Sequence, residues 1–294
     1  MTGDPGNWGR WGPDDQRGTL NLLSPERVLA ACALPRSGRV IALGLPVDSR
    51  TERLPGRPPI QHFMAIDGAD YEAGARTLQG RAVADDALVM SPHGTTTHVD
   101  ALAHVWADGT LYNGHPQALV HSRGARRCGI EHVDGIVTRG ILLDLPAVAG
   151  VAALGPDTVI DAALLEAAER RAGVRCAAAD AVLFRTGASA AGSPAGGRQA
   201  GRDGSACRWL AERDVCLVGS DNAAIGPLVD GGGFHVDRED DAHLVLLWRH
   251  GILLVEMLEL GALAAAGATA FLFVLAPLRI TGGTASPVNP IAVL

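Results

Sequence analysis

The sequence of 294 residues contains no lysine, so all 25 basic side chains are arginine. This absence excludes Schiff-base chemistry, a lysine general base and a lysine-dependent phosphate-binding loop. Aromatic residues make up only 4% of the chain, and the core must therefore be built mostly from alanine, valine and leucine. Positive charge is also in deficit, because the net charge is −7, which argues against binding to nucleic acid.

Cysteine pairs and targeting signals are missing as well. The five cysteines show no C-x-x-C spacing, which indicates reduced, buried thiols rather than a disulfide framework or a zinc ribbon. No apolar segment typical of a signal peptide follows Met1, so we expect a cytoplasmic protein. The uncharged stretch Leu260–Leu278 is long enough to cross a membrane, but Gly267 divides it. We therefore predict a buried helix followed by a buried strand, and no membrane contact.

The chain is rich in apolar residues, and they occur in segments that read alternately as strands and helices. Hydrophobic residues make up 47% and charged residues 19%, enough for a sizeable core. The predicted strands are Gly38–Leu45, Gly140–Leu145, Ala181–Arg185, Val215–Val218, Ile252–Val255 and Thr269–Leu275. The predicted helices are Pro25–Ala33, Thr158–Arg171, Cys207–Arg213 and Asp240–His250. This alternation predicts an α/β class with a mixed, largely buried sheet.

The chain is predicted to form one domain over residues 1–294. Residues 1–80 would supply an N-terminal arm, a first helix and a lid-like excursion, and residues 81–294 the core. The excursion Arg50–Gly80 is polar and too long for an inert connection, so it is a candidate substrate lid. His62 and Phe63 within it are candidate substrate contacts.

Four candidate functional residues, His93, His98, Asp100 and His104, lie within one short stretch of sequence. If Thr95–Ala101 forms a strand, His98 and Asp100 point to the same face. Imidazole and carboxylate together suit Zn²⁺, Mn²⁺ or Fe²⁺. His104 could face the same cavity without being a ligand. The alternative is that these histidines only make hydrogen bonds in a core or on a surface strand.

His93 does not fit a regular strand. It precedes His98 by an odd number of residues, which would send it to the opposite face. Only a bulge within residues 94–97 would return it, and bulges often lie beside active sites. His93 is therefore a possible ligand on that condition.

Two later residues extend the candidate site. Glu256 follows four apolar residues of a predicted buried strand, so its carboxylate must be paired, protonated or metal-bound. His243 lies in a predicted helix, where the alternative is a surface position. Candidate pocket residues complete the set: Asp221, which follows the strand V-C-L-V-G, and Trp106, Tyr112 and Asn113, which are close to His104 in sequence.

The segment T-H-V-D-A-L-A-H resembles the T-H-x-D-(A)-x-x-H core of the cyclase family of metal-dependent hydrolases. That family includes bacterial kynurenine formamidase and isatin hydrolase. Further blocks resemble its longer branch, and they cover nearly the whole chain. They are W-G-R-W-G-P-D-D, T-R-G-I-L-L-D, D-A-V-L-F-R-T-G, H-L-V-L-L-W-R-H-G-I-L-L-V-E and P-L-R-I-T-G-G-T-A-S-P-V-N-P.

The resemblance implies a swivelling β/β/α fold, a homo-oligomer (dimer or tetramer) and a zinc or manganese centre of one or two ions. By position, His98 and Asp100 would bind the first ion. Asp100, His243 and Glu256 would form the second site, and His104 would be the catalytic histidine. Asp221 matches an acid near the family's site.

One position departs from the family pattern. The family's first histidine, four residues before the T-H-x-D histidine, is Gly94 here. Either His93 substitutes through a bulge, or the first site lacks a ligand and binds metal weakly or not at all.

The leading functional hypothesis is metal-dependent hydrolysis of a C–N bond in a small amide, N-formyl or lactam substrate. The alternative is a polyketide-type cyclase or dehydratase that uses the metal as a Lewis acid and His104 as a base. A third class is a binding protein without catalysis. The Gly94 departure favours it, but retention of the other five site residues weighs against it.

Overall fold

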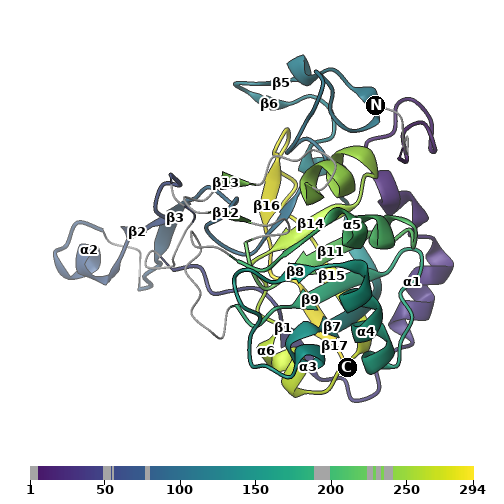
Figure 1. Cartoon of the computed structure of the whole chain (residues 1–294). Coiled ribbons are helices and arrows are strands. Elements are labelled where there is room, and N and C mark those ends of the chain that lie inside the picture. The colour runs from purple at the N-terminus through teal and green to yellow at the C-terminus, as the bar shows by residue number, and fades with distance from the viewer. Residues whose placement is uncertain are drawn as a thin grey trace.

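The structure is a computed structural model that describes residues 6–48, 54, 56–76, 80–188, 199–223, 228–229, 233–234 and 241–294. Its centre is a nine-stranded mixed sheet with the strand order β1-β17-β15-β7-β9-β11-β14-β4-β16 (Figure 1). The strands of this sheet are β1 (Val40–Ala42), β4 (His98–Asp100), β7 (Ile136–Asp144), β9 (Ala181–Arg185), β11 (Leu217–Ser220), β14 (Leu253–Glu256), β15 (Ala270–Leu275), β16 (Ala285–Pro287) and β17 (Ile291–Val293). The expected mixed α/β class is confirmed.

The middle of the sheet is parallel and both flanks are antiparallel. Strands β7, β9, β11 and β14 run parallel, whereas β15 and β4 pair antiparallel on the two sides. The parallel strands are almost wholly buried, which explains their continuous apolar sequence. Their side chains belong to one hydrophobic core that also includes residues of the helices.

The helices are short. They are α1 (Pro25–Cys32), α2 (Gly68–Glu72), α3 (Leu145–Ala149), α4 (Ala162–Ala172), α5 (Gly204–Ala211), α6 (Gly261–Ala265), the π-helix η5 (His243–Arg249), and the 3₁₀ turns η1 (Gly18–Leu22), η2 (Tyr112–Gly114), η3 (Gln117–Leu119) and η4 (Ile130–His132). As predicted, α1 begins with Pro25 behind Ser24, whose side chain accepts a hydrogen bond from the amide of Arg27. Helix α4 ends at Gly173, whose left-handed conformation glycine adopts without strain.

The predicted lid-like excursion contains an exposed arm. Strands β2 (Gln61–Ile66) and β3 (Asp85–Val89) form an antiparallel hairpin with α2 between them, and the arm projects from the body of the molecule (Figure 1). Parts of the excursion, residues 50–53, 55 and 77–79, lie outside the described residues. Three further two-stranded pairs are β5 (Val120–His121) with β6 (Gly124–Ala125), β8 (Val159–Ile160) with β10 (Gly201–Arg202), and β12 (Leu228–Val229) with β13 (Gly233–Phe234).

Several predicted elements differ from the structure in their bounds or type. The strand predicted over residues 95–101 is reduced to β4, because a turn occupies His93–Thr95. The helix predicted from Asp240 is a π-helix that begins at His243, and Asp240 itself lies outside the described residues. The helix predicted from Thr158 begins at Ala162, since residues 159–160 form β8 instead.

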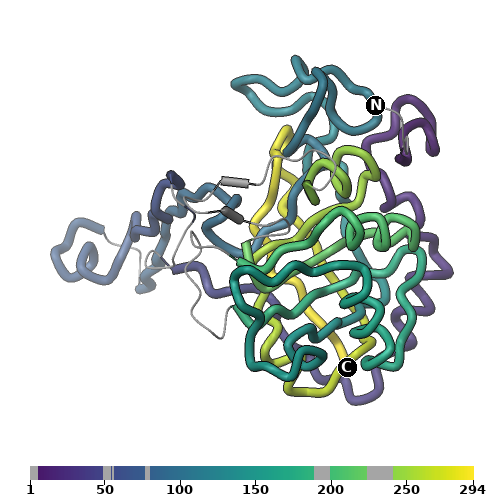
Figure 2. Tube along the Cα trace, in the orientation of Figure 1, coloured from purple at the N-terminus to yellow at the C-terminus, as the bar shows by residue number. Residues whose placement is uncertain are grey.

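The uncharged stretch Leu260–Leu278 divides as predicted into α6 and β15 on the two sides of Gly267. Within the described ranges, no helix has the length and apolarity needed to span a bilayer. In Figure 2 the first described residues, from residue 6 on, lie near the segment that contains η5, and a hydrogen bond from the Trp8 indole to the Trp248 carbonyl oxygen joins the two.

Candidate metal centre

Strand β4 carries the first pair of candidate ligands, and its neighbours supply the next. It lies between β14 and β16, and the register places Glu256 directly opposite His98. Because opposite residues of an antiparallel pair share a face, the Glu256 side chain meets those of His98 and Asp100. The sequence predicted the shared face of His98 and Asp100, and the strand order explains how Glu256 reaches it.

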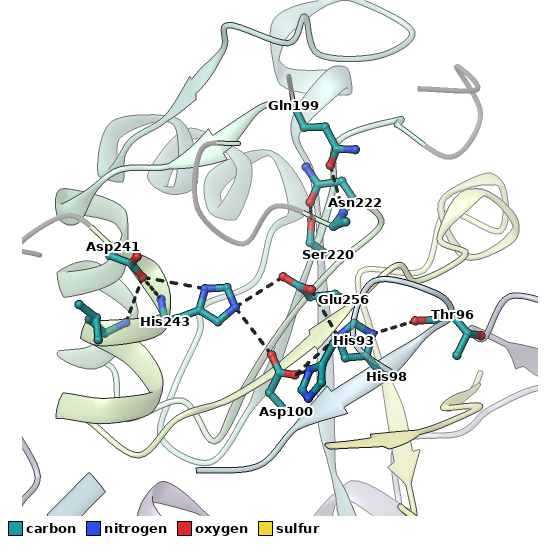
Figure 3. Close-up of polar contacts among 12 residues, drawn as sticks. His93, Thr96, His98, Asp100, Gln199, Ser220, Asn222, Asp241, His243 and Glu256 are labelled. Atoms are coloured by element: carbon teal, nitrogen blue, oxygen red, sulfur yellow. Dashed lines mark hydrogen bonds and ion pairs between the residues drawn. The ribbon is translucent and has the colours of Figure 1, made fainter. Parts of the chain in front are cut away.

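His98 is the central imidazole of the cluster. Its Nε2 lies 3.5 Å from Asp100 Oδ1 and 3.4 Å from Glu256 Oε2. Its Nδ1 lies 2.8 Å from the carbonyl oxygen of Thr96, which identifies Nδ1 as the protonated nitrogen in the neutral ring. The ring is thereby held with Nε2 directed at both carboxylates (Figure 3).

His93 reaches the cluster through a turn rather than a strand bulge. Gly94 has φ +68°, and its carbonyl oxygen accepts a hydrogen bond from the Leu54 amide at 2.8 Å. His93 Nδ1 then lies 3.1 Å from Asp100 Oδ1, and Nε2 lies 3.2 Å from Thr284 Oγ1. The residue that departs from the family pattern is therefore the one whose backbone conformation turns His93 inward.

His243 approaches from the opposite side, at the start of η5. Its Nε2 lies 3.8 Å from Asp100 Oδ2 and 3.8 Å from Glu256 Oε1. Asp241 accepts hydrogen bonds from the amides of His243 and Leu244 at 2.8 and 3.1 Å. Asp241 Oδ1 also lies 3.9 Å from His243 Nδ1, so the same carboxylate caps the helix start and faces the far side of the ring (Figure 3).

His104 lies beside the cluster and borders an open pocket. Its ring stacks on that of His93 with centroids 3.9 Å apart and lies 5.8 Å from the His243 ring. The pocket has a volume of about 330 Å³, in the range of small-molecule sites. It is lined by His104, Val105, Trp106, Asp241, His243 and Leu244. Trp106, a predicted pocket residue, is 46% exposed at its rim.

The polar atoms of this cluster fit a cation. Both Asp100 oxygens and Glu256 Oε1 are buried, and among the described residues the imidazole nitrogens that approach them, at 3.1 to 3.8 Å, do not meet them with hydrogen-bond geometry. Buried carboxylate oxygens left in this state are costly unless a positive charge lies between them. Within the described part of the chain, two sets of residues have donor atoms within 4.8 Å of one another and could hold a metal ion: His93, His98 and Asp100, and Asp100, His104 and His243. Asp100 is common to both sets.

The buried charges of the cluster also shift the pKa values of its members. Burial acts to lower the pKa of His98, but Glu256 and Asp100 outweigh it and raise this pKa to about 9. Burial opposes ionisation of Asp100, yet the surrounding histidines hold its pKa well below the usual range. Burial lowers the pKa of His104 to about 3, which keeps its ring neutral. The two carboxylates therefore favour positive charge at His98, whereas the His104 ring stays neutral.

Two predicted substrate residues lie away from this cluster. His62 and Phe63 are on β2 of the exposed arm, where the His62 ring contacts Asp86 at 2.6 Å and Phe63 is 54% exposed. Within this chain, neither reaches the pocket beside His104. Figure 1 shows why, since the arm projects outward from the sheet that carries the cluster.

Three other predicted residues have structural contacts. The Tyr112 hydroxyl donates to Asp15 at 3.0 Å, and Asn113 Nδ2 donates to the Gly12 carbonyl oxygen at 3.0 Å. Asp221 is buried and accepts hydrogen bonds from the amide and hydroxyl of Thr186 at 2.8 and 2.7 Å. Burial raises the pKa of Asp221. These contacts stabilise the N-terminal segment and the loop after β9.

Two residues that interact with members of the cluster, Asp241 and Arg202, are absent from the sequence predictions. Asp241 could have been recognised, because an aspartate just before a helical segment is a common cap. Arg202 gave no signal: it is fully buried, with its guanidinium 4.8 Å from the Phe184 ring centroid. Burial lowers the pKa of Arg202 to about 10, while Cys207, Glu256 and Asp221 act to raise it.

The chain matches one family of known proteins. The model of the family described as "Putative cyclase" matches residues 41–227, more than half of the chain. The crystal structure of a novel cyclase is 33% identical, with a TM-score of 0.89 over 98% of this chain and 99% of that one. The chain belongs to this cyclase family.

More distant structures share the fold of this family member. Isatin hydrolase A from Labrenzia aggregata is 22% identical, with a TM-score of 0.61 over 93% of this chain and 98% of that one. A predicted metal-dependent hydrolase from Bacillus stearothermophilus is 20% identical, with a TM-score of 0.56 over 86% of this chain and 97% of that one. A search of curated proteins found no match.

The turn at Gly94 generates a prediction. A Cβ at this position would lie 2.5 Å from Leu54 Cδ1 and would add strain at φ +68°. We expect Gly94→Ala to destabilise the protein by about 1–3 kcal/mol and to weaken metal binding, because the turn can no longer hold His93 beside Asp100. Thermal unfolding and Zn²⁺ titration measure the two effects.

Gly74→Ala is the matched control for this change. Gly74 has φ +74°, but among the described residues no atom beyond its two chain neighbours lies within 4 Å of the position that a methyl group would take, so it shares the backbone penalty without the clash. It should lose a little stability and keep full metal affinity. Equal metal affinity in both variants would show that the turn does not position a ligand.

Proposed function

We propose that the protein is a metal-dependent hydrolase that cleaves a C–N bond in a small amide, N-formyl or lactam substrate. The observation that carries this proposal is the convergence of two buried carboxylates and four histidines beside an open pocket of about 330 Å³. Similarity to isatin hydrolases supports the substrate class, because isatin is a lactam.

The proposed cofactor is Zn²⁺ or Mn²⁺, as one or two ions. His93, His98 and Asp100 would hold the first ion, and Asp100, His243 and Glu256 would hold a second. Mixed imidazole and carboxylate donors suit both metals. A cation in this position would polarise a substrate carbonyl and acidify a water molecule.

His104 is the proposed catalytic residue. It borders the pocket next to His243 and its ring is stacked on that of His93, so it is held at the boundary between the cluster and the substrate space. From there it would accept the proton of the attacking water and return it to the leaving nitrogen. General acid–base help of this kind contributes roughly 10²–10⁴-fold to the rate.

A second candidate function is a natural-product cyclase or dehydratase. The description of the matching family and the 33% identical cyclase structure favour it. The same groups would serve: a polarised ketone, and His104 as the base that removes an α-proton. The two reactions differ in product, since hydrolysis adds water and cyclisation gives an isomer or loses water.

Isatin is therefore a suitable first probe. We expect mass spectrometry to show a product that has gained one water molecule, with the rate abolished by a chelator and restored by Zn²⁺ or Mn²⁺. A product from a polyketide-type ketone that is isomeric or has lost water, with no hydrolysis of amides, would support the cyclase instead. Elemental analysis that finds no metal after reconstitution would contradict both and favour a binding protein.

His104→Ala provides a separate test of the catalytic assignment. We expect turnover to fall by roughly 10²–10⁴-fold while the metal content stays at the wild-type level, because His104 transfers protons and does not hold the ion. Measuring both quantities on the same preparation is essential, since His104 also lies near Asp100 and His243. Loss of bound metal in this variant would make His104 a ligand and refute the assignment.

We also propose that the protein is a homo-oligomer that associates through the exposed arm. A two-stranded hairpin is rarely stable alone in water, and β2 and β3 expose several apolar side chains. The exposed apolar residues are Phe63, Met64, Leu88 and Val89. The arm also carries more exposed acidic residues than exposed arginines (Arg76 and Arg81), whereas the β5–β6 hairpin of the same chain carries exposed arginines, so a second copy offers the complementary charge. The acidic residues are Asp67, Glu72, Asp85 and Asp86, and the arginines are Arg123 and Arg126.

Light scattering tests this association with two matched valines. Val89 on β3 and Val159 on β8 are each 57% exposed. We expect Val89→Glu to shift the protein toward the monomer mass, because a buried charge at the interface is costly, and Val159→Glu to leave the mass unchanged. A wild-type monomer, or no difference between the variants, would contradict the proposal.

A further inference from the structure

The N-terminal segment, residues 6–19, makes a set of contacts that the proposed chemistry does not use. It contains the W-G-R-W-G-P motif and crosses the carboxyl end of η5. The Trp8 indole donates to the Trp248 carbonyl oxygen at 2.8 Å, and the Asn7 amide donates to the Arg249 carbonyl oxygen at 3.1 Å. Asn7 Nδ2 donates to the His250 carbonyl oxygen at 2.8 Å.

The same segment also donates a hydrogen bond to the carbonyl group of the next residue, Gly251. The Thr19 amide donates to the Gly251 carbonyl oxygen at 2.9 Å. Gly18 packs so closely there that a Cβ would lie 2.1 Å from the Gly251 oxygen. Four consecutive carbonyl groups, of residues 248–251, therefore bond to residues 7, 8 and 19. The first two, of Trp248 and Arg249, lie in the last turn of η5 and are groups that a helix leaves unsatisfied at its carboxyl end, and the other two belong to the residues that follow it.

The segment capped in this way carries ligands at both ends. Helix η5 begins with His243, and the residues after it lead into β14, which ends with Glu256. The helix is of the π type, in which hydrogen bonds join residues five apart and which is frequent at functional sites. A change to α-helical hydrogen bonding would shift the register between His243 and the fixed carboxyl end.

The segment is itself anchored on two other parts of the chain. Arg10 forms a bidentate ion pair with Asp214 at 2.5 and 2.9 Å. Asn113 accepts a hydrogen bond from the Gly9 amide at 2.7 Å and donates to the Gly12 carbonyl oxygen at 3.0 Å. These bonds hold the segment in place independently of its contacts with η5.

We propose that residues 6–19 are a positioning clamp that keeps η5 in its π-helical register and so holds His243 against Asp100 and Glu256. Trp8 and Asn7 are the positioning residues of this clamp. The Trp8 ring also lies edge-on to the Trp248 ring, with centroids 5.0 Å apart, so the contact is apolar as well as polar. The inference rests on the proposed metal centre for its consequence, but the clamp itself can be measured without metal.

The first measurement is amide hydrogen exchange of residues 243–252 in metal-free protein. Trp8→Phe combined with Asn7→Asp removes two donors and keeps the ring contact and the oxygen that accepts from Arg10. We expect exchange in this segment to rise roughly tenfold or more, because two helix-terminal hydrogen bonds are lost. Trp11→Phe is the matched control, because it makes the same change of side chain in the same segment at a residue that is not one of the two positioning residues. The Trp11 ring contacts the Arg10 guanidinium, 4.7 Å from the ring centroid. Unchanged exchange in the double variant would overturn the clamp.

The second measurement is titration with Co²⁺, followed through its visible absorption bands. We expect the double variant to bind the ion that contacts His243 about 10–100-fold more weakly, as is typical when a group that orients a ligand is lost. Trp11→Phe should bind like wild type, and His243→Ala should lose this site. Faster exchange with unchanged Co²⁺ affinity would overturn the link to His243.

The two measurements separate the clamp from the metal centre. If wild-type protein binds no Co²⁺, the metal centre and the link to His243 both fail, whereas the exchange data still decide whether residues 6–19 cap η5. If the double variant does not fold, judged by circular dichroism, Trp8→Phe alone takes its place with the same expected directions.

Discussion

The pair of buried carboxylates, Asp100 and Glu256, is the constraint on which the rest of the site depends. Both lie in the core, where a negative charge is stable only beside a positive one. Histidines from two segments remote in sequence, residues 93–104 and the start of η5, surround them, and the two acids raise the pKa of His98 in return. An apolar core of alanine, valine and leucine around this cluster leaves the charges few other partners of comparable strength.

The sheet brings these charges together by a change of strand direction. The parallel strands β7, β9, β11 and β14 form a conventional buried centre, but β4 then pairs antiparallel with β14. This pairing sets Glu256 opposite His98, although the two residues are distant in sequence. Because β4 has only three residues, the chain before it is free to turn, and that turn delivers His93.

Helix η5 closes the cluster from the other side. Its first residue, His243, is oriented by Asp241, and its last carbonyl groups are taken by the N-terminal segment. A short helix is marginal on its own, and most of its stability must come from tertiary contacts. The ends of η5 are therefore as important to the site as its apolar face. The W-G-R-W-G-P motif carries no residue of the proposed chemistry, but its Trp8 donates a hydrogen bond to the carboxyl end of η5.

Local patterns in the chain were enough to predict the class of fold and most of the candidate ligands. Apolar runs and a well-capped first helix predicted the elements, and the spacing of His98 and Asp100 predicted their shared face, because such patterns depend only on local geometry. The folded arrangement was needed to show that His93 joins the cluster, that Asp241 orients His243, and that Tyr112 and Asn113 stabilise the N-terminal segment. These outcomes depend on a left-handed turn packed against Leu54, on a π-helical register and on contacts between segments remote in sequence. No local periodicity encodes such contacts, because they exist only once the sheet has placed its strands side by side.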